Sequence, residues 1–327
     1  MNIVDMHCDT LSKLYQAKQE RKPLALVENL LDIDLKRMKQ AGSLCQNFAV
    51  FLDLAETDTP YHQAMEMIDL FEEEMAKNDS LIRQARSYQD MIQNRESGRM
   101  SALLTLEEGE TCEGSIEKLH AFYDRGVRMM TLSWNHKNTL GYPNVDADTK
   151  TFYTPDTVHG LTEKGILFVE EMQKMGMIVD VSHMSDAGFY DVLKHTKKPF
   201  VASHSNARAV CPWVRNMTDD MIRRLAEKGG VMGLNFCMDF LIDTKGGERK
   251  TNYMEAVAKH ASHIINVGGE ECLGLGSDFD GIKRNEDLRG VETLPDLAKH
   301  FLKAGLSERQ VDKIFSQNVL RVYKELL

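Results

Sequence analysis

The feature that most constrains the fold is an alternation that recurs along the whole chain. A short apolar, partly β-branched run ends in a polar or ionisable residue and is followed by a longer stretch with helical periodicity. Eight runs of this kind are predicted to be strands: Ile3–His7, Leu44–Phe51, Ala102–Glu107, Val127–Trp134, Met177–His183, Phe200–His204, Val231–Phe236 and Cys272–Asp278. This alternation favours an α/β fold of the TIM (β/α)8 barrel type over a doubly wound sheet, which more often has about five or six strands.

Helical periodicity is clearest over Thr59–Lys77 and Leu161–Met175, where apolar side chains recur every three or four residues. Further helices are expected to begin at Ser185, Thr218 and Ser307, because a side-chain oxygen at these positions can accept hydrogen bonds from free backbone N–H groups. A last helix over 308–327 is expected to close the outer ring or to form an oligomer contact. No repeat, low-complexity tract or Pro/Ser-rich linker divides the chain, so residues 1–327 are predicted to form one domain.

The charge balance excludes two classes of partner. Forty Lys and Arg residues against fifty Asp and Glu residues give a net charge of −10, and no basic block stands out, so neither nucleic acid nor an anionic membrane is expected as a partner. No signal-peptide pattern and no run of eighteen apolar residues is present, which predicts a cytoplasmic protein. The six cysteines lack C-x-x-C spacing and are expected to be free thiols, mostly buried.

Residues that can bind metal stand at the ends of the predicted strands, where TIM barrels carry their active sites. They are His7, Asp9, Glu107, His183, His204 and Asp278. Each histidine alone is more often a hydrogen-bonded loop residue, but three imidazoles at strand ends together with several carboxylates favour a dinuclear divalent metal centre of the hydrolytic kind. The spacing of His7 and Asp9 places both side chains on one face of a strand.

Two acidic residues compete for the bridging position between the metals. Strand alternation puts Leu103, Thr105 and Glu107 on one face, which favours Glu107 over Glu108. Glu108 is interpreted as part of a solvated charge cluster. Other histidines lie in charged helical stretches and are expected on solvated faces: His62, His120, His260, His263 and His300.

Ordered sequence blocks spread over nearly the whole chain resemble the membrane dipeptidase (renal dipeptidase) family of zinc-dependent dipeptidases, peptidase family M19. The blocks are Asp5-Met6-His7-Cys8-Asp9, Leu106-Glu107, Asp180-Val181-Ser182-His183-Met184-Ser185, Ser203-His204-Ser205, Val214-Arg215-Asn216 and Gly276-Ser277-Asp278-Phe279-Asp280-Gly281.

The resemblance implies a TIM barrel of the metallo-dependent hydrolase type that holds two zinc ions. His7 and Asp9 would bind one ion, His183 and His204 the other, and Glu107 would bridge them. The substrate would be a dipeptide, including dipeptides with a D-residue at the second position, hydrolysed by a metal-activated water. Another dinuclear amidohydrolase that acts on N-acyl amino acids is the alternative, and a homo-oligomer such as a dimer is a further expectation.

Further roles follow from the same resemblance. Asp278 corresponds to the acidic residue near the reacting water, and is expected to carry the proton from that water to the leaving amine. Arg215 corresponds to the arginine that binds the substrate carboxylate. Mammalian members have a substrate-contacting histidine after the fourth strand, where this chain has Trp134; His136 is the nearby residue that could take that role.

Overall fold

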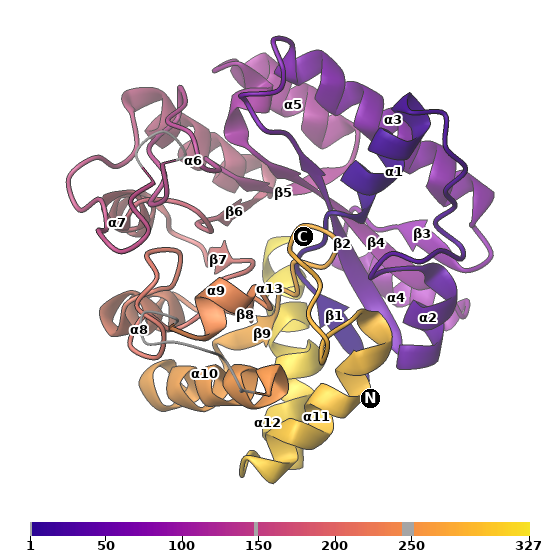
Figure 1. Cartoon of the computed structure of the whole chain (residues 1–327). Helices are drawn as coiled ribbons and strands as arrows, with labels where there is room; N and C mark the ends of the chain where they lie inside the picture. Colours follow the sequence, from indigo (N-terminus) through magenta and orange to yellow (C-terminus); the bar gives the residue numbers. More distant parts are fainter. Residues whose placement is uncertain (1, 147–149, 244–251) are drawn as a thin grey trace.

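The computed structural model describes residues 2–146, 150–243 and 252–327. Its parallel sheet has the order β2-β1-β9-β8-β7-β6-β5-β4, and β2 also pairs with β4, which closes the barrel (Figure 1). The barrel strands are β1 (Ile3–Asp5), β2 (Ser43–Phe51), β4 (Met100–Glu107), β5 (Val127–Thr131), β6 (Ile178–Asp180), β7 (Val201–Ala202), β8 (Val231–Leu234) and β9 (Leu273–Leu275). The predicted eight-stranded α/β barrel is confirmed.

One strand lies outside the predicted set. The three-residue β3 (Ile82–Gln84) pairs with the first residues of β4, from Ile82 opposite Met100 to Gln84 opposite Ala102. β5 takes over as the neighbour of β4 from Leu104 onward. β3 therefore extends the sheet only beside the amino end of β4 and leaves the eight-stranded barrel intact.

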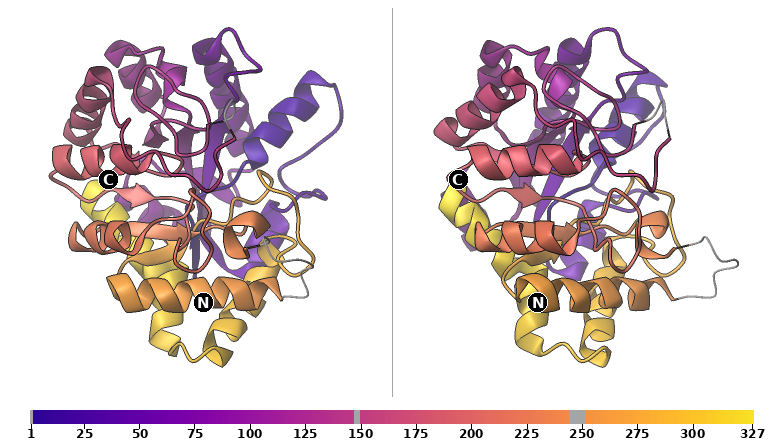
Figure 2. Two further views of the ribbon diagram at one scale, coloured as in Figure 1. Left: turned by 60° about the vertical axis from the view of Figure 1, so that its left-hand side comes forward. Right: turned by 90° about the vertical axis from the view of Figure 1, so that its left-hand side faces the viewer.

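Helices surround the strands, and the side views show long loops gathered at one end of the barrel (Figure 2). The helices are α1 (Thr10–Gln19), α2 (Leu35–Ala41), α3 (Pro60–Lys77), α4 (Tyr88–Glu96), α5 (Ile116–Asp124), α6 (Glu163–Met175), α7 (Asp186–His195), α8 (Asp219–Glu227), α9 (Met238–Leu241), α10 (Tyr253–Gly268), α11 (Leu294–Lys303), α12 (Glu308–Asp312) and α13 (Asn318–Leu326). The predicted caps are confirmed, because the side chains of Ser185, Thr218 and Ser307 each accept from the backbone N–H three residues later.

Most strands end earlier than predicted. β1 stops at Asp5, β6 at Asp180 and β9 at Leu275, each two or three residues before the polar residue that was expected to close the strand. The physical reason is visible at β6, where the Asp180 carboxylate accepts the backbone N–H groups of Ser182 and Ser203 and so competes with ladder hydrogen bonds. Apart from Glu107, which is the last residue of β4, the candidate metal ligands and Asp278 therefore lie just beyond the strands.

The C-terminal helix does not lie in the outer ring. Val319, Val322 and Tyr323 of α13 pack in one buried cluster with side chains from the amino ends of strands, including Ile178 and Val201. A π-helical turn at Lys313–Gln317 separates α12 from α13, so the single helix expected over 308–327 is interrupted. α13 thus closes the end of the barrel opposite the candidate site.

Two expectations about polar residues were wrong. His260 on α10 is fully buried, because it lies on the same helical face as the buried Val257, Ala261 and Ile264. Glu108 is also fully buried, and its carboxylate accepts from the backbone N–H of Trp134. By contrast, the free cysteines are buried as expected, apart from the partly exposed Cys237.

Candidate metal centre and active site

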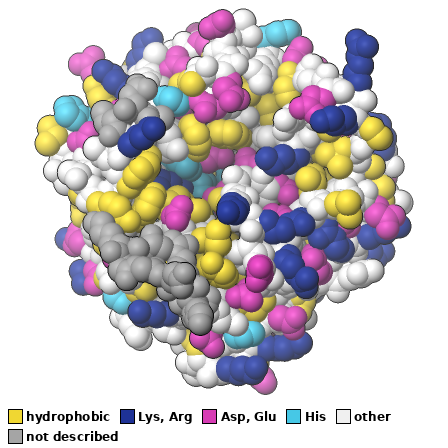
Figure 3. Space-filling view, in the orientation of Figure 1, with side chains coloured by type: hydrophobic (Ala, Val, Ile, Leu, Met, Phe, Trp, Pro, Cys, Tyr) yellow, Lys and Arg dark blue, Asp and Glu magenta, His cyan; other side chains and the backbone are white. Residues whose placement is uncertain are grey.

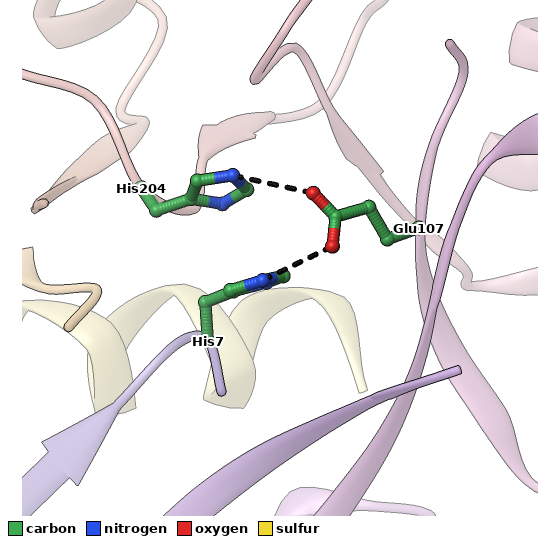
Figure 4. A group of neighbouring side chains, drawn as sticks. All are labelled: His7, Glu107 and His204. Atoms are coloured by element: carbon green, nitrogen blue, oxygen red, sulfur yellow. Dashed lines mark ion pairs between the residues drawn. The ribbon is translucent and has the colours of Figure 1, made fainter. Parts of the chain in front are cut away.

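Glu107, the last residue of β4, lies between histidines that come from different strands. Its Oε2 atom is 3.2 Å from His7 Nε2, whereas its Oε1 atom is 3.0 Å from His183 Nε2 and 3.4 Å from His204 Nε2. Figure 4 shows His7 and His204 directed at the two oxygens of this carboxylate. The two oxygens of Glu107 thus face separate histidines, which is the arrangement needed to bridge two cations.

Two further carboxylates complete the group. Asp9 Oδ2 lies 3.3 Å from His7 Nε2, and Asp278 Oδ1 lies 3.9 Å from the same nitrogen. Two sets of potential ligand atoms, each contained within 4.8 Å, share His7: one with Glu107 and His204, the other with Asp9 and Asp278. The structure therefore brings together all the ligating residue types that the strand ends were predicted to supply.

Hydrogen bonds on the far side of two histidines define their tautomers. His204 Nδ1 lies 2.7 Å from Ser203 Oγ, and this hydroxyl donates to Asp180 Oδ2 at 2.5 Å. Ser203 must therefore accept the proton of His204 Nδ1, and His183 Nδ1 likewise faces Asn135 Oδ1 at 3.1 Å. Both Nε2 atoms then carry lone pairs, yet they lie only 2.9 Å apart. A cation between them would remove this repulsion.

The remaining donor atoms also fit a divalent cation. Asp9 Oδ1 is buried and has no hydrogen-bond partner among the residues that the structure describes. Burial lowers the pKa of His183 to about 4, which favours the neutral ring that binds metal. Burial alone would lower the pKa of His7, but the carboxylates of Glu107 and Asp9 raise it well above its usual value. The positive charge that these carboxylates favour is one that a bound cation would supply in place of the proton. Neutral imidazoles combined with carboxylates are the ligands that zinc binds in hydrolytic centres.

Asp278 differs from the other carboxylates in its protonation. Burial raises its pKa to about 7, and the nearby carboxylates of Asp9 and Glu107 add to the rise. Asn235 Nδ2 donates to Asp278 Oδ2 at 2.9 Å, which leaves Oδ1 directed at His7. A carboxyl group near neutrality beside candidate metal ligands is suited to accept and return a proton.

The backbone at the site adopts strained conformations. His183, Asp278 and Asp280 all have positive φ values, of 70°, 64° and 68°, in the left-handed region that non-glycine residues seldom adopt. At Gly281 a Cβ atom would lie 2.1 Å from Asp9 Oδ2 and 2.6 Å from Asp278 Oδ1. Only glycine leaves these two carboxylates in place.

Two aspartate–serine pairs support the site, and sequence reasoning assigned them no role. Asp5 accepts the backbone N–H of Ser277 at 2.8 Å and its hydroxyl at 2.5 Å. Asp180 accepts the same two groups of Ser203, also at 2.8 and 2.5 Å. Each serine immediately precedes a candidate site residue in the chain. A buried acid at the end of an apolar strand is the sequence signal that could have identified both pairs.

A cavity of about 730 Å³ lies at the candidate site, and its lining includes Glu107, His183 and Asp278. Figure 3 shows histidine and acidic side chains in a hollow near the centre of this face. Trp134 and Asn135 also line the cavity.

No helix in the described part of the chain is both long and apolar enough to cross a membrane.

Three successive residues of the loop after β5, Trp134, Asn135 and His136, contact different parts of the site. Trp134 packs edge-on against Phe51 at a ring distance of 4.9 Å. His136 pairs instead with Asp53, at 3.0 Å between Nε2 and Oδ1. Asn135, which sequence reasoning did not single out, lies between them in the chain and contacts His183. From this loop, the Asn135 amide therefore hydrogen-bonds to His183, and the Trp134 ring lies 6.1 Å from the ring of the same histidine.

Arg215 carries a buried positive charge without a carboxylate partner. It is 5% exposed, and among residues 2–146, 150–243 and 252–327 no acidic side chain forms an ion pair with it. Its hydrogen bonds are long, 3.3 Å to the His204 carbonyl and 3.5 Å to Ser205 Oγ, and its Nε has no partner in the described part of the chain. Burial lowers its pKa, which reflects the cost of this unpaired charge. The guanidinium also lies 5.4 Å from the ring of Phe240, a residue of the cavity wall.

Comparison with known proteins agrees with this geometry. The family model "Membrane dipeptidase (Peptidase family M19)" matches residues 1–326. An uncharacterized dipeptidase of Schizosaccharomyces pombe is 34% identical over 305 residues, covering 89% of this chain and 71% of the relative. Dipeptidase tcpJ of Claviceps purpurea is 32% identical, covering 90% and 69%.

Two solved structures are similar over their whole length. Dipeptidase AC, a metallopeptidase of family M19, superimposes with a TM-score of 0.90 at 27% identity and covers 100% of this chain and 98% of its own. A metallopeptidase from Rhodobacter sphaeroides, bound to a phosphinate mimic of L-Ala-D-Ala, also has a TM-score of 0.90, at 25% identity, with 100% and 99% covered. Together with the end-to-end family match, these likenesses show that the chain belongs to the membrane dipeptidase family, peptidase family M19, and is a metallo-dipeptidase.

Proposed function

We propose that the chain hydrolyses dipeptides at a centre of two divalent metal ions, with zinc as the first choice. His7 and Asp9 would hold one ion, His183 and His204 the other, and Glu107 would bridge them. The observation that carries this proposal is the pair of imidazole Nε2 atoms, 2.9 Å apart, that face each other and the same Glu107 oxygen. Imidazole nitrogens and carboxylate oxygens are the ligands that zinc prefers in hydrolytic sites.

Bound divalent ions would acidify a water molecule and polarise the scissile carbonyl. Asp278 would accept the proton of that water and pass it to the leaving amine. Its Oδ1 atom faces His7 beside the residues that would hold the ions, which is the position that a proton acceptor for this water requires. Asn235 holds the other carboxylate oxygen, so the reactive oxygen stays directed at the site.

Arg215 would bind the free carboxylate of the substrate. A buried guanidinium without an ion pair is costly, and an incoming carboxylate would supply both the missing charge and the missing acceptors. This requirement favours short substrates whose C-terminus lies close to the reacting bond. The Rhodobacter sphaeroides neighbour is bound to an L-Ala-D-Ala mimic, which supports a D-residue at the second position here as well.

The wall of the cavity after β5 would contact the rest of the substrate. Trp134 would pack against a substrate side chain, and the Asn135 amide would offer a hydrogen bond in the place where His136 was expected to reach. His136 would act indirectly, through its pairing with Asp53. A single domain over residues 1–327, a cytoplasmic location and a homo-oligomer such as a dimer stay predictions.

Elemental analysis combined with a substrate panel tests the proposal. We expect about two divalent ions per chain and release of free amino acids from dipeptides. The panel should include dipeptides with a D-residue at the second position, and N-acyl amino acids, which also carry a free carboxylate. A fully active preparation with at most one ion per chain would contradict the dinuclear centre, and preferential cleavage of N-acyl amino acids would favour the alternative amidohydrolase.

A further inference from the structure

A second arginine, Arg208, holds the backbone on both sides of Arg215. Its Nη2 atom donates to the carbonyl of Val214 at 2.9 Å, and its Nε atom donates to the carbonyl of Asn216 at 2.7 Å. These are the residues immediately before and after Arg215. One guanidinium therefore fixes the short segment 214–216 from both ends.

Arg208 is itself held by a nearly buried carboxylate. Its Nη1 and Nη2 atoms donate to the two oxygens of Asp186, the first residue of α7, both at 2.7 Å. Asn144 Nδ2 donates to Asp186 Oδ1 at 2.7 Å and to the Val214 carbonyl at 3.0 Å. Asp186 and Asn144 are 6% and 4% exposed. The network thus ties segment 214–216 to the start of α7.

Arg215 lacks a comparable anchor for its own side chain. Within the described ranges, its two hydrogen bonds are 3.3 and 3.5 Å long, and its Nε has no partner. The position of the guanidinium is consequently set mainly by the backbone that carries it. Whatever fixes that backbone also fixes where an incoming carboxylate can be bound.

We infer that Arg208, braced by Asp186, is a positioning residue for recognition of the substrate carboxylate and acts through Arg215. The inference rests on the proposed role of Arg215. Arg208 has no contact with the cavity wall residues Glu107, His183 or Asp278 among its hydrogen bonds, so it does not join the reacting groups. Lysine cannot replace it, because a single ammonium cannot bind a carboxylate side-on and two carbonyls at once.

The test compares a dipeptide that has a free C-terminus with the same dipeptide as its C-terminal amide. The measured quantity is the ratio of kcat/KM for the acid to kcat/KM for the amide. In Arg208→Met this ratio should fall about ten- to hundredfold, the range expected when a binding group is misplaced by about 1 Å. The fall should arise from a higher KM for the acid, with kcat and metal content close to wild type.

A double-mutant cycle shows whether Arg208 works through Arg215. Arg215→Met should abolish the preference for the free acid, and Arg208→Met/Arg215→Met should be no worse than Arg215→Met alone. If Arg215→Met leaves the ratio unchanged, the proposed role of Arg215 is wrong. If Arg215→Met abolishes the preference for the free acid but Arg208→Met keeps the wild-type ratio, only the inference about Arg208 is wrong. The same holds if the ratio in the double variant falls by the product of the two single losses.

Arg128 provides a matched control. It also donates to backbone carbonyls, those of Arg86, Tyr123 and Val127, but it lies on β5 toward the amino end of the barrel. Arg128→Met should lower thermal stability without changing the acid-to-amide ratio. An equal change of the ratio in Arg128→Met would show that general loosening, and not positioning, explains the Arg208 result.

The Arg208 variants are expected to fold. Ala207 and Met217 form a backbone bridge at the base of the loop, and the backbone N–H of Arg208 donates to the Met217 carbonyl at 2.8 Å. Should Arg208→Met nevertheless fail to fold, Asp186→Asn weakens the same brace and keeps its shape. That variant should lower the acid-to-amide ratio in the same direction, and an unchanged ratio would overturn the inference.

Discussion

His260 should make folding of this protein sensitive to acid, although it lies outside the catalytic centre. Its Nδ1 atom accepts from the backbone N–H of Ala207 at 3.1 Å, and its Nε2 atom faces the carbonyl of Leu241 at 3.0 Å. Both bonds are satisfied only by a neutral ring with its proton on Nε2. The ring joins α10 to the loop after β7 and to α9. Burial lowers its pKa from 6.5 to about 4.

The sign and size of the effect follow from proton linkage. In the unfolded chain this histidine takes up a proton below about pH 6.5, whereas the folded protein does so only near pH 4. The stabilisation is therefore complete above pH 6.5 and is lost as the pH falls from 6.5 toward 4. Between about pH 8 and pH 5 the loss amounts to roughly 2 kcal/mol, and the full shift corresponds to about 3.4 kcal/mol.

The assay is urea unfolding of the wild type and of His260→Gln, each near pH 8 and near pH 5. Glutamine can accept from Ala207 and donate to Leu241, as histidine does, but it does not titrate. We expect the wild type to lose about 2 kcal/mol more than the variant between the two pH values. The metal ligands titrate in both proteins, so their contribution cancels in the comparison.

His120→Gln serves as the control, because His120 is exposed on α5 and should leave the wild-type pH dependence in place. Equal losses for the wild type and His260→Gln would show that His260 is not held neutral by burial. If the free energy of unfolding of His120→Gln fell between pH 8 and pH 5 by as little as that of His260→Gln, the comparison would report surface charge and not the burial of His260.

Two predictions concern the candidate metal centre. Glu107→Gln should lose bound metal and activity, whereas Glu108→Gln should keep its metal through dialysis. The reason is that Glu107 faces the histidines and Glu108 faces the Trp134 backbone. A Glu108→Gln protein without bound metal would show that the two roles are reversed. Asp278→Asn should keep its metal but lose about 10²- to 10⁴-fold in kcat, measured by steady-state kinetics beside elemental analysis, and a kcat near wild type would rule out Asp278 as the proton carrier.

The barrel could be predicted from the sequence because its signal repeats. Eight apolar runs separated by helical stretches leave few other architectures, and an error of two residues in any run does not change the count. β3 was missed because three residues, of which only Ile82 is fully buried, carry no periodicity. The carboxyl ends of strands were placed too far along because apolar residues such as Met6 and Val181 continue the pattern after the ladder has stopped.

The site was more predictable than its surroundings. His7, Glu107 and His204 meet because all carboxyl ends of parallel strands point to one end of the barrel, whatever the local boundaries are. His260 could have been assigned correctly from its helical spacing to Val257 and Ile264, but its charged neighbours were given more weight. Asn135 and Arg208 carry no comparable signal, because their contacts are set by loops whose paths depend on the whole fold.

The early strand ends and the placement of the site residues have one cause. β1 and β6 are both the tripeptide Ile-Val-Asp, and each ends at an aspartate that binds a serine just after the neighbouring strand, Ser277 after β9 and Ser203 after β7. By accepting both the N–H and the hydroxyl of that serine, the carboxylate substitutes for ladder hydrogen bonds immediately before a candidate site residue. At Ser203 the same hydroxyl also determines which nitrogen of the following histidine carries its proton. Asp5 and Asp180, which sequence analysis placed inside longer strands, thus end these strands and hold the serines that precede Asp278 and His204.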